Sequence, residues 1–346
     1  MKDMSNVIER TPLAYLDHNV IDLMKRSELA ESYIRAVFTQ NELTPVYSYV
    51  NIEEIAKAQK AESQQIYLRY LAELGAKLIV PKTTVFQYTG FANIHTVDPF
   101  EVFNEYTERR VAEPEYGYGH KGLLQKFYGA RPQESYGEVL SNGAREFHSL
   151  IEQAKLEDKD GQFTQSLDFC NAFFEENFSS LGQLLDAQEQ SSVVSMLDSM
   201  EPFGPMTLNN VDRRDVLERI YTETLKLVPE SAIAEIKSNE RFKDSYHFYG
   251  LQDLNTNLEK VNHLYHYLNF YGYYRDKRMQ KTSRMDSHIN DMTHAGIASF
   301  CAILFSVDKD LIHKARAAYS YLNIGVQPIL LSLKNEELIV DYITEV

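Results

Sequence analysis

The stretch from residue 13 to residue 24 reads LAYLDHNVIDLM and joins two kinds of hydrophobic pattern. Its first four residues form a short apolar run that is typical of a buried strand, and the residues from Val20 onward have the spacing of a helix. Asp17 stands at the junction. We therefore expect a strand that runs directly into a helix, with an acidic side chain between them.

The same alternation of strand and helix recurs toward both ends of the chain. Apolar and β-branched runs predict further strands at residues 45–50, 77–80, 302–307 and 326–331. Helical spacing is found over residues 52–74, where Gly75 supplies a stop, and over residues 285–300 and 311–321. Alternating strands and helices require crossover connections, so we expect an α/β fold with a mainly parallel sheet covered on both faces.

Residues 85–284 have a different character. Long helical periods dominate this segment, most clearly at residues 181–200, 212–228 and 254–271. The two flanks, residues 1–84 and 285–346, together have the length of one ordinary α/β domain. The sequence therefore predicts an α/β domain that is split by a large all-helical insertion.

The composition narrows the classes of function. The chain has 346 residues, 44% of them hydrophobic and 25% charged, which is ordinary for a folded protein. A formal net charge of -15 excludes a generally basic surface for nucleic acid or anionic lipid, but it leaves room for a local basic patch. The two distant cysteines support neither a disulfide framework nor a cysteine zinc site. With no long apolar run, we expect a cytoplasmic protein that does not span a membrane.

Four acidic residues stand at or near the predicted strand ends. In an open parallel sheet, ligands bind beyond the carboxyl ends of the strands, and Asp17 and Asp308 directly follow strands. Glu54 falls about one turn into the helix after the second strand, and Asp291 lies in the helix before the 302–307 strand. Converging carboxylates repel one another unless a cation neutralises them, and oxygen ligands favour Mg²⁺ or Mn²⁺. Such a site can support phosphodiester hydrolysis.

The residues around these acids form a series of short motifs. An Asp-x-Asn follows the first strand at residues 17–19, and a Ser-x5-Glu-Ile covers residues 48–55. Residues 290–295 read NDMTHA, and the 302–307 strand leads into SVDKDL at 306–311. In this order, the motifs resemble those of the PIN-like nuclease superfamily. The resemblance implies a PIN-like domain built from the two flanks.

The resemblance also implies an activity and a set of site residues. It implies a metal-dependent endoribonuclease for single-stranded or structured RNA, and a toxin or antiviral defence effector, because many bacterial relatives have those roles. The implied catalytic residues, which are also the ligands of Mg²⁺ or Mn²⁺, are Asp17, Glu54, Asp291 and Asp308. Asn19 and Ser48 match polar positions that orient the carboxylates, and Asp310 either assists Asp308 or is a surface residue.

Each acid also has a simpler interpretation. Asp17 can cap the helix that follows it, and Glu54 can belong to a solvated helix face. Asp286 competes with Asp291 for one role. His294, three residues after Asp291, either contacts substrate or packs as a structural residue.

The sharpest local charge contrast lies at residues 275–284. Five basic residues occur there, opposed only by Asp276, and tyrosine and phenylalanine residues precede them at 265–274. The rings can stack on unpaired bases while the cations hold phosphates; alternatively, the rings are core and the cations a solvated face. The predicted nucleic-acid-binding residues are Arg275, Lys277, Arg278, Lys281, Arg284 and His288.

RNA is therefore the expected partner, with DNA as the alternative, and the helical insertion can serve a regulatory protein or a second copy of the chain. Two other functions stay open. One is a catalytically impaired PIN-like binding or scaffold protein, because Ala302 stands where family members often carry a further Asp. The other is a structure-specific DNA nuclease, against which the net acidity argues.

Overall fold

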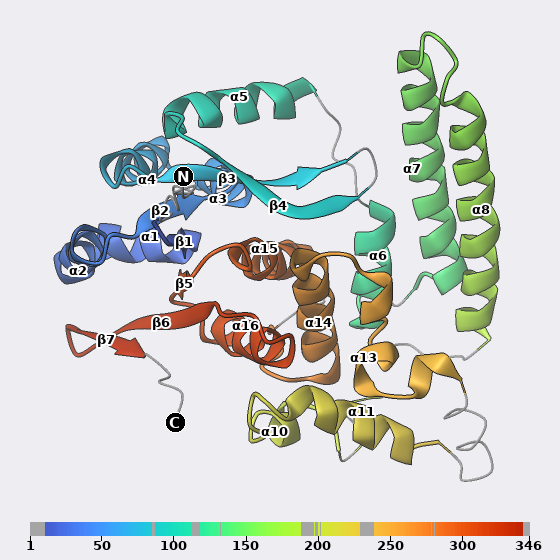
Figure 1. Ribbon diagram of the computed structural model, residues 1–346. Coiled ribbons are helices and arrows are strands. Elements are labelled where there is room, and N and C mark those ends of the chain that lie inside the picture. Colours follow the sequence, from blue (N-terminus) through green and yellow to red (C-terminus); the bar gives the residue numbers. More distant parts are fainter. Residues whose placement is uncertain are drawn as a thin grey trace, which may run out of the picture.

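A seven-stranded sheet with helices on both faces organises the molecule (Figure 1). In this computed structural model the described residues are 11–84, 87–112, 118–131, 133–187, 197, 200, 202–228, 239–277, 279 and 281–341. The predicted α/β class and the mostly parallel sheet are both confirmed.

The five central strands run parallel and the two edge strands run antiparallel to their neighbours. The strands are β1 (Leu13–Leu16), β2 (Thr44–Tyr47), β3 (Lys77–Thr83), β4 (Tyr88–His95), β5 (Ile303–Ser306), β6 (Gln327–Lys334) and β7 (Glu337–Asp341). They are ordered β4-β3-β2-β1-β5-β6-β7. The chain moves from β1 toward one edge and later resumes on the other side of β1, so the topological switch point lies between β1 and β5.

The two antiparallel edge strands were not expected from the sequence. β4 contains Gly90 and consists mostly of exposed or half-buried residues, so it has no apolar run to indicate a buried strand. It pairs with β3 and extends the sheet to His95, beyond the boundary predicted at residue 84. The segment predicted as an all-helical insertion therefore begins with a strand of the sheet.

The helices near the amino terminus cover one face of the sheet. They are α1 (His18–Arg26), α2 (Glu28–Gln40), α3 (Tyr49–Ala56) and α4 (Ala61–Glu73). The predicted 52–74 helix is thus interrupted at residues 57–60, where the Gln64 side chain donates to the backbone oxygens of Ala56 and Ala58. Ala14 and Leu16 of β1 pack on this face, whereas Tyr15 belongs to the core on the other face.

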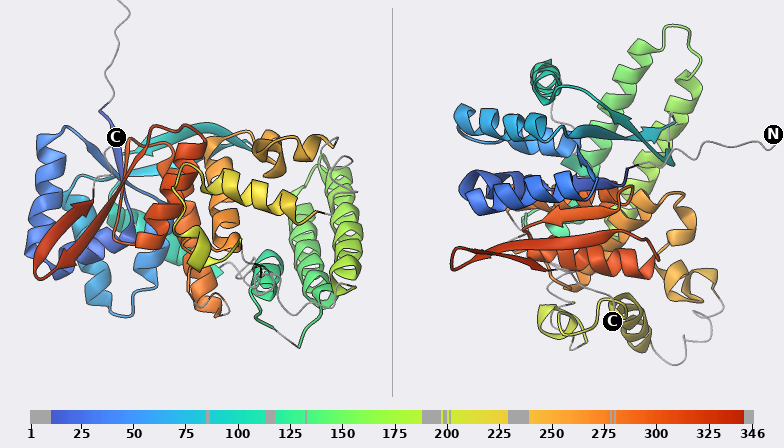
Figure 2. Two further views of the ribbon diagram at one scale, coloured as in Figure 1. Left: turned by 90° about the horizontal axis from the view of Figure 1, so that it is seen from below. Right: turned by 60° about the vertical axis from the view of Figure 1, so that its left-hand side comes forward.

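The other described helices follow β4 in the sequence. They are α5 (Pro99–Ala112), α6 (Tyr118–Phe127), α7 (Tyr136–Glu157), α8 (Thr164–Asp186), α10 (Pro205–Leu208), α11 (Val216–Lys226), α13 (Ser245–Phe248), α14 (Asn257–Tyr271), α15 (Thr282–Ala298) and α16 (Lys309–Tyr321), with short 3-10 turns at Glu240–Phe242 and Leu251–Asp253. Most of the predicted 181–200 helix beyond α8 lies outside the described residues. The α7–α8 hairpin stands apart from the sheet (Figures 1 and 2). None of the described helices combines the length and apolarity needed to cross a membrane.

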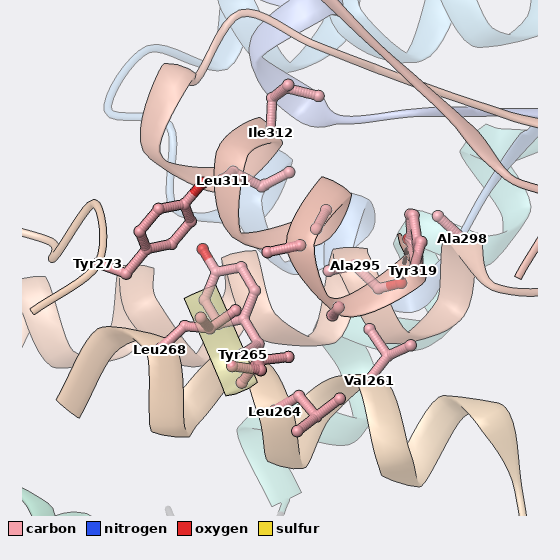
Figure 3. Packing of buried hydrophobic residues seen from close by; sticks show 14 of the residues in the cluster. Val261, Leu264, Tyr265, Leu268, Tyr273, Ala295, Ala298, Leu311, Ile312 and Tyr319 are labelled. Carbon is pink, nitrogen blue, oxygen red and sulfur yellow. Dashed lines mark hydrogen bonds between the residues drawn. The ribbon is translucent and has the colours of Figure 1, made fainter. Parts of the chain in front are cut away.

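The core on the second face joins the helical middle to the sheet. α14, α15 and α16 pack together there, and Leu268, Ala295 and Leu311 meet in one buried cluster (Figure 3). Tyr15 and Leu304 of the sheet belong to the same cluster. Much of the helical middle, including α11 and α14, therefore shares its core with the α/β part. A separate, smaller cluster is formed by Leu124, Tyr128, Met279 and Met285.

Candidate metal centre

The carboxyl ends of β1 and β5 lie side by side at the switch point. Leu16 pairs with Phe305, and the backbone N–H of Asp17 donates to the carbonyl of Phe305 at 3.1 Å. Asp17 and Asp308 therefore leave the sheet at the same edge. Ser306 links them, because its hydroxyl donates to Asp17 Oδ2 at 2.5 Å and accepts from the backbone N–H of Asp308 at 2.9 Å.

Asp17 precedes α1 without capping it. Its side chain makes no cap hydrogen bond, whereas Asp308 caps α16 by accepting from the backbone N–H of Leu311 at 2.9 Å. Asp17 Oδ2 accepts a second hydrogen bond from Asn19 at 3.2 Å, in agreement with the supporting role predicted for Asn19. Asp17 Oδ1 is buried and has no hydrogen-bond partner. An ionised oxygen in that position needs a cation.

Glu54 and His294 meet beside this oxygen. His294 Nε2 lies 2.9 Å from Glu54 Oε2 and 3.6 Å from Asp17 Oδ1, and Asn290 donates to the other Glu54 oxygen at 3.3 Å. The neighbouring Glu53 instead pairs with Lys57. Asp17, Glu54 and His294 each offer one ligand atom, and the three atoms lie within 4.8 Å of one another. Among the described residues, this is the group of acidic, histidine and cysteine side chains that could hold a metal ion.

A network of buried polar groups supports His294 from behind. Its Nδ1 shares a hydrogen bond with the Tyr15 hydroxyl at 2.7 Å, and that hydroxyl also lies 2.6 Å from Ser48 Oγ and 3.1 Å from Asn51 Oδ1. Ser48 caps α3 and contacts Tyr15, so it reaches the site through Tyr15 and His294. One feature of the sequence pointed to His294. It follows Asp291 by three residues, so the two side chains share a face of a helix.

A pocket of about 520 Å³ opens at this edge of the sheet. It is lined by Asn19, Glu54, Asp276, Lys277, Arg284, Ser287, His288, Asp291, Asp308 and Asp310. Three of the four predicted metal ligands thus line one pocket. The fourth, Asp17, accepts a hydrogen bond from Asn19, which also lines the pocket. Asp291 lines the pocket, whereas the competing Asp286 is not part of its lining.

The ionisation of the acids reflects their crowding. Burial, together with repulsion from Asp276, Asp308 and Asp17, raises the pKa of Asp291 well above its ordinary value. Burial also raises the pKa of Asp17 despite the attraction of His294. For Glu54, burial acts in the same direction, but the charge and hydrogen bond of His294 outweigh it and lower the pKa to about 2. A bound cation would relieve the repulsion among these carboxylates.

A second buried network borders the pocket. Asp276 accepts from Lys314 Nζ and from His288 Nδ1, each at 2.6 Å, and Lys314 also donates to Asn269 Oδ1 at 3.1 Å. The side chains of Lys314 and His288 are fully buried. Burial opposes ionisation of Asp276, but the charge of Lys314 and the bond from His288 lower its pKa to about 2. Lys314 had no signal in the sequence, because a single lysine on a helix is normally solvated.

The predicted nucleic-acid-binding residues fall into different places. Lys277 and Arg284 line the pocket, and Lys281 is exposed just before α15. Arg275 donates to the backbone oxygens of Asn269 and Phe270 near the end of α14. His288 is turned into the protein toward Asp276, and Arg278 lies outside the described residues.

The aromatic rings before this segment lie mainly in the interior. Tyr265, Tyr271 and Tyr273 are buried in the core shared by α14 and α16. Figure 3 shows Tyr265 and Tyr273 in this core. Tyr274 stacks on His313 with ring centroids 3.7 Å apart. The buried rings are therefore core residues, and they are not available to stack on bases.

Ala302 lies far from the carboxylates along its strand. It immediately precedes β5, and its backbone N–H donates to the carbonyl of Leu13 at the beginning of β1. The site is at the other end of β5, after Ser306. An alanine at residue 302 therefore removes no group from this candidate centre.

Comparison with family models, with curated proteins and with solved structures found no significant match.

Proposed function

We propose that this protein is a PIN-like, metal-dependent nuclease that hydrolyses phosphodiester bonds. The observation that carries the proposal is the convergence of Asp17, Glu54, Asp291 and Asp308 at the switch point of a parallel sheet, beside an open pocket. Acids from both flanks of the sequence meet there, in the order that the family resemblance implies.

The donor set fits a divalent cation. Asp17 Oδ1 is a buried oxygen without a partner, and the raised pKa of Asp291 reflects repulsion that a cation would relieve. Carboxylate oxygens are ligands that Mg²⁺ and Mn²⁺ accept. When bound, the ion supplies charge neutralisation and polarisation of water and phosphate.

The residues of the chain hold the carboxylates in place for this chemistry. Ser306 and Asn19 orient Asp17, and Asn290 and His294 orient Glu54. Asp308 is anchored by the first turn of α16. Because these carboxylates are already oriented, binding of substrate costs little free energy of reorganisation.

Lys277 and Arg284 can hold the phosphates of the substrate. Both line the pocket that contains Glu54, Asp291 and Asp308, so cations and carboxylates face the same space. A phosphate held by the cations would lie close to the acids. The preference for RNA over DNA comes from the family resemblance.

The test is cleavage of labelled RNA and DNA in the presence of Mn²⁺ by wild type, Asp17→Asn and Glu54→Gln. We expect each substitution to lower the cleavage rate by about 100-fold or more, because it removes a charged ligand. Glu53→Gln is the matched control, since Glu53 is the adjacent glutamate and pairs with Lys57 instead. It should cleave like wild type.

Three outcomes would change the proposal. Cleavage that survives both Asp17→Asn and Glu54→Gln would place the reaction elsewhere. Folded wild type that cleaves neither nucleic acid would favour the binding or scaffold function. Cleavage of DNA alone would favour the structure-specific DNA nuclease.

A further inference from the structure

The hydrogen bonds behind His294 provide an acceptor for a proton on Nδ1, which leaves Nε2 free to bind a ligand. Asn51 provides the fixed reference, because its Nδ2 donates to the carbonyl of Leu16 at 2.8 Å and its Oδ1 accepts from the backbone N–H of Ser48 at 2.8 Å. Both partners are backbone groups with a single role, so Asn51 Oδ1 can only accept.

Tyr15 transmits this polarity to His294. Its hydroxyl has one proton and three hydrogen-bond neighbours, namely Ser48 Oγ at 2.6 Å, His294 Nδ1 at 2.7 Å and Asn51 Oδ1 at 3.1 Å. When the Tyr15 proton goes to Asn51 Oδ1 or Ser48 Oγ, the Tyr15 oxygen accepts from His294 Nδ1, and Nδ1 carries the imidazole proton. In the neutral imidazole, the lone pair is then on Nε2.

In this tautomer the Nε2 lone pair points at two other acceptors, whereas a proton on Nε2 would be donated to Glu54 Oε2. Nε2 lies 2.9 Å from Glu54 Oε2 and 3.6 Å from Asp17 Oδ1, and the Asp17 oxygen is buried without a hydrogen-bond donor. Three electron-rich atoms directed at one place repel one another unless a cation lies among them. The cation is either a second proton on His294 or a metal ion.

We propose that His294 Nε2, Glu54 and Asp17 together bind a first-row transition-metal ion in preference to Mg²⁺, and that Tyr15 is the positioning residue for His294. Imidazole nitrogen suits ions of the Mn²⁺ to Zn²⁺ series, whereas Mg²⁺ favours oxygen ligands and retains its water. Metal–ligand bonds of about 2.1 Å bring adjacent ligand atoms to roughly 3.0 to 3.4 Å of one another. The separations of 2.9 and 3.6 Å at Nε2 are close to these values.

The catalytic role of the ion rests on the proposed nuclease function. Binding of the ion does not, because it is measured without substrate. The probe is Mn²⁺, titrated into the full chain and followed by electron paramagnetic resonance, with Mg²⁺ as competitor. We expect a single tight Mn²⁺ site that a 100-fold excess of Mg²⁺ does not empty. Pulsed measurements should detect coupling of the bound Mn²⁺ to one imidazole nitrogen.

Two variants and one control identify the ligand. His294→Asp keeps an oxygen ligand but should abolish the nitrogen coupling and reduce the preference for Mn²⁺ over Mg²⁺ at least tenfold. Tyr15→Phe removes the acceptor of the Nδ1 proton and should weaken Mn²⁺ binding about 10- to 100-fold, with the fold retained. His95→Asn, which replaces an exposed histidine on β4, should leave the affinity and the nitrogen coupling unchanged.

The wild-type spectrum decides the inference even if a variant does not fold. Absence of Mn²⁺ binding, or bound Mn²⁺ without nitrogen coupling, would overturn it. Nitrogen-coupled Mn²⁺ in a protein that cleaves neither RNA nor DNA would support it and contradict only the proposed function. Cleavage by a protein whose bound Mn²⁺ has only oxygen ligands would support the proposed function and contradict the inference about His294.

Discussion

At the scale of single residues, the pocket has an excess of acids in its lining, and two buried basic side chains outside the lining pair with these acids. His294 faces Glu54 and Asp17, and Lys314 faces Asp276. Taking such charges out of water is costly, so each must have a well-placed partner. The consequences of losing a partner can be measured.

Replacing Lys314 by Met should destabilise the protein strongly. The substitution leaves the largely buried Asp276 carboxylate with the hydrogen bond from His288, whose pKa is lowered by burial, and breaking a buried pair in this way costs about 3 to 5 kcal/mol. Urea unfolding measures the change. Lys309→Met, at an exposed position on the same helix, is the control and should change the free energy of unfolding by no more than about 0.5 kcal/mol. Equal stability of the two variants would contradict the assignment of Lys314 and Asp276 as a buried ion pair.

The contribution of Asp276 should disappear in acid. Its pKa is about 2 in the folded protein and about 3.9 in an unfolded chain, so the unfolded state binds more protons as the pH falls. The stabilisation, about 3 kcal/mol, is fully present above pH 5 and is lost as the pH falls toward 2. The measurement is the difference in the free energy of unfolding between wild type and Asp276→Asn, determined from pH 6 to pH 2.5. A difference that stays constant over this range would show that Asp276 titrates normally.

At the scale of elements, the end of α14 determines where the basic segment begins. Gly272 terminates the helix with a φ of 105°, a conformation that other residues rarely adopt. A Cβ atom built there would lie 2.6 Å from the Cα atom of Gly204, so the helix end is also in close contact with another backbone segment. The following residues include Asp276 and Lys277, which line the pocket.

Gly272→Ala should therefore both lower stability and disturb the pocket. The positive φ alone costs about 1 to 3 kcal/mol, and the backbone contact adds to it. Thermal unfolding is the measurement, and Gly325→Ala, where a Cβ meets nothing within 4 Å, is the matched control. We expect the melting temperature to fall clearly for Gly272→Ala and little for Gly325→Ala. An unchanged melting temperature for Gly272→Ala would mean that the two segments separate without cost.

At the scale of the whole molecule, a net charge of -15 opposes association with nucleic acid, so binding must depend on the local cations. Lys277→Glu combined with Arg284→Glu should weaken binding of single-stranded RNA and reduce the slope of log K against log salt by about 1.4, which corresponds to two phosphate contacts. Filter binding at several salt concentrations gives the slope.

The matched control makes the same change in net charge elsewhere. Lys226→Glu combined with Lys334→Glu replaces two exposed lysines outside the pocket. If global repulsion were responsible, both double variants would lose affinity equally and the role of the pocket cations would be refuted. We expect the loss to be confined largely to the pocket variant.

Much of the fold could be predicted from the sequence because its signals are local. The five parallel strands have apolar runs, and the segments around Asp17 and Asp308 reveal the change from strand to helix. β4 was missed because its residues are largely exposed or half-buried and include Gly90. The split of the 52–74 segment into α3 and α4 was missed because the Gln64 side chain holds the break, and helical spacing continues across it.

The sequence by itself determined the α/β class and the order of the acids, because hydrophobic period and position at a strand end are properties of neighbouring residues. Only the tertiary structure brought His294 to Glu54, buried Lys314 against Asp276 and joined the helical middle to the sheet core. These contacts link residues far apart in the chain, and their stability depends on burial and on the nearest charges. No local pattern contains that information.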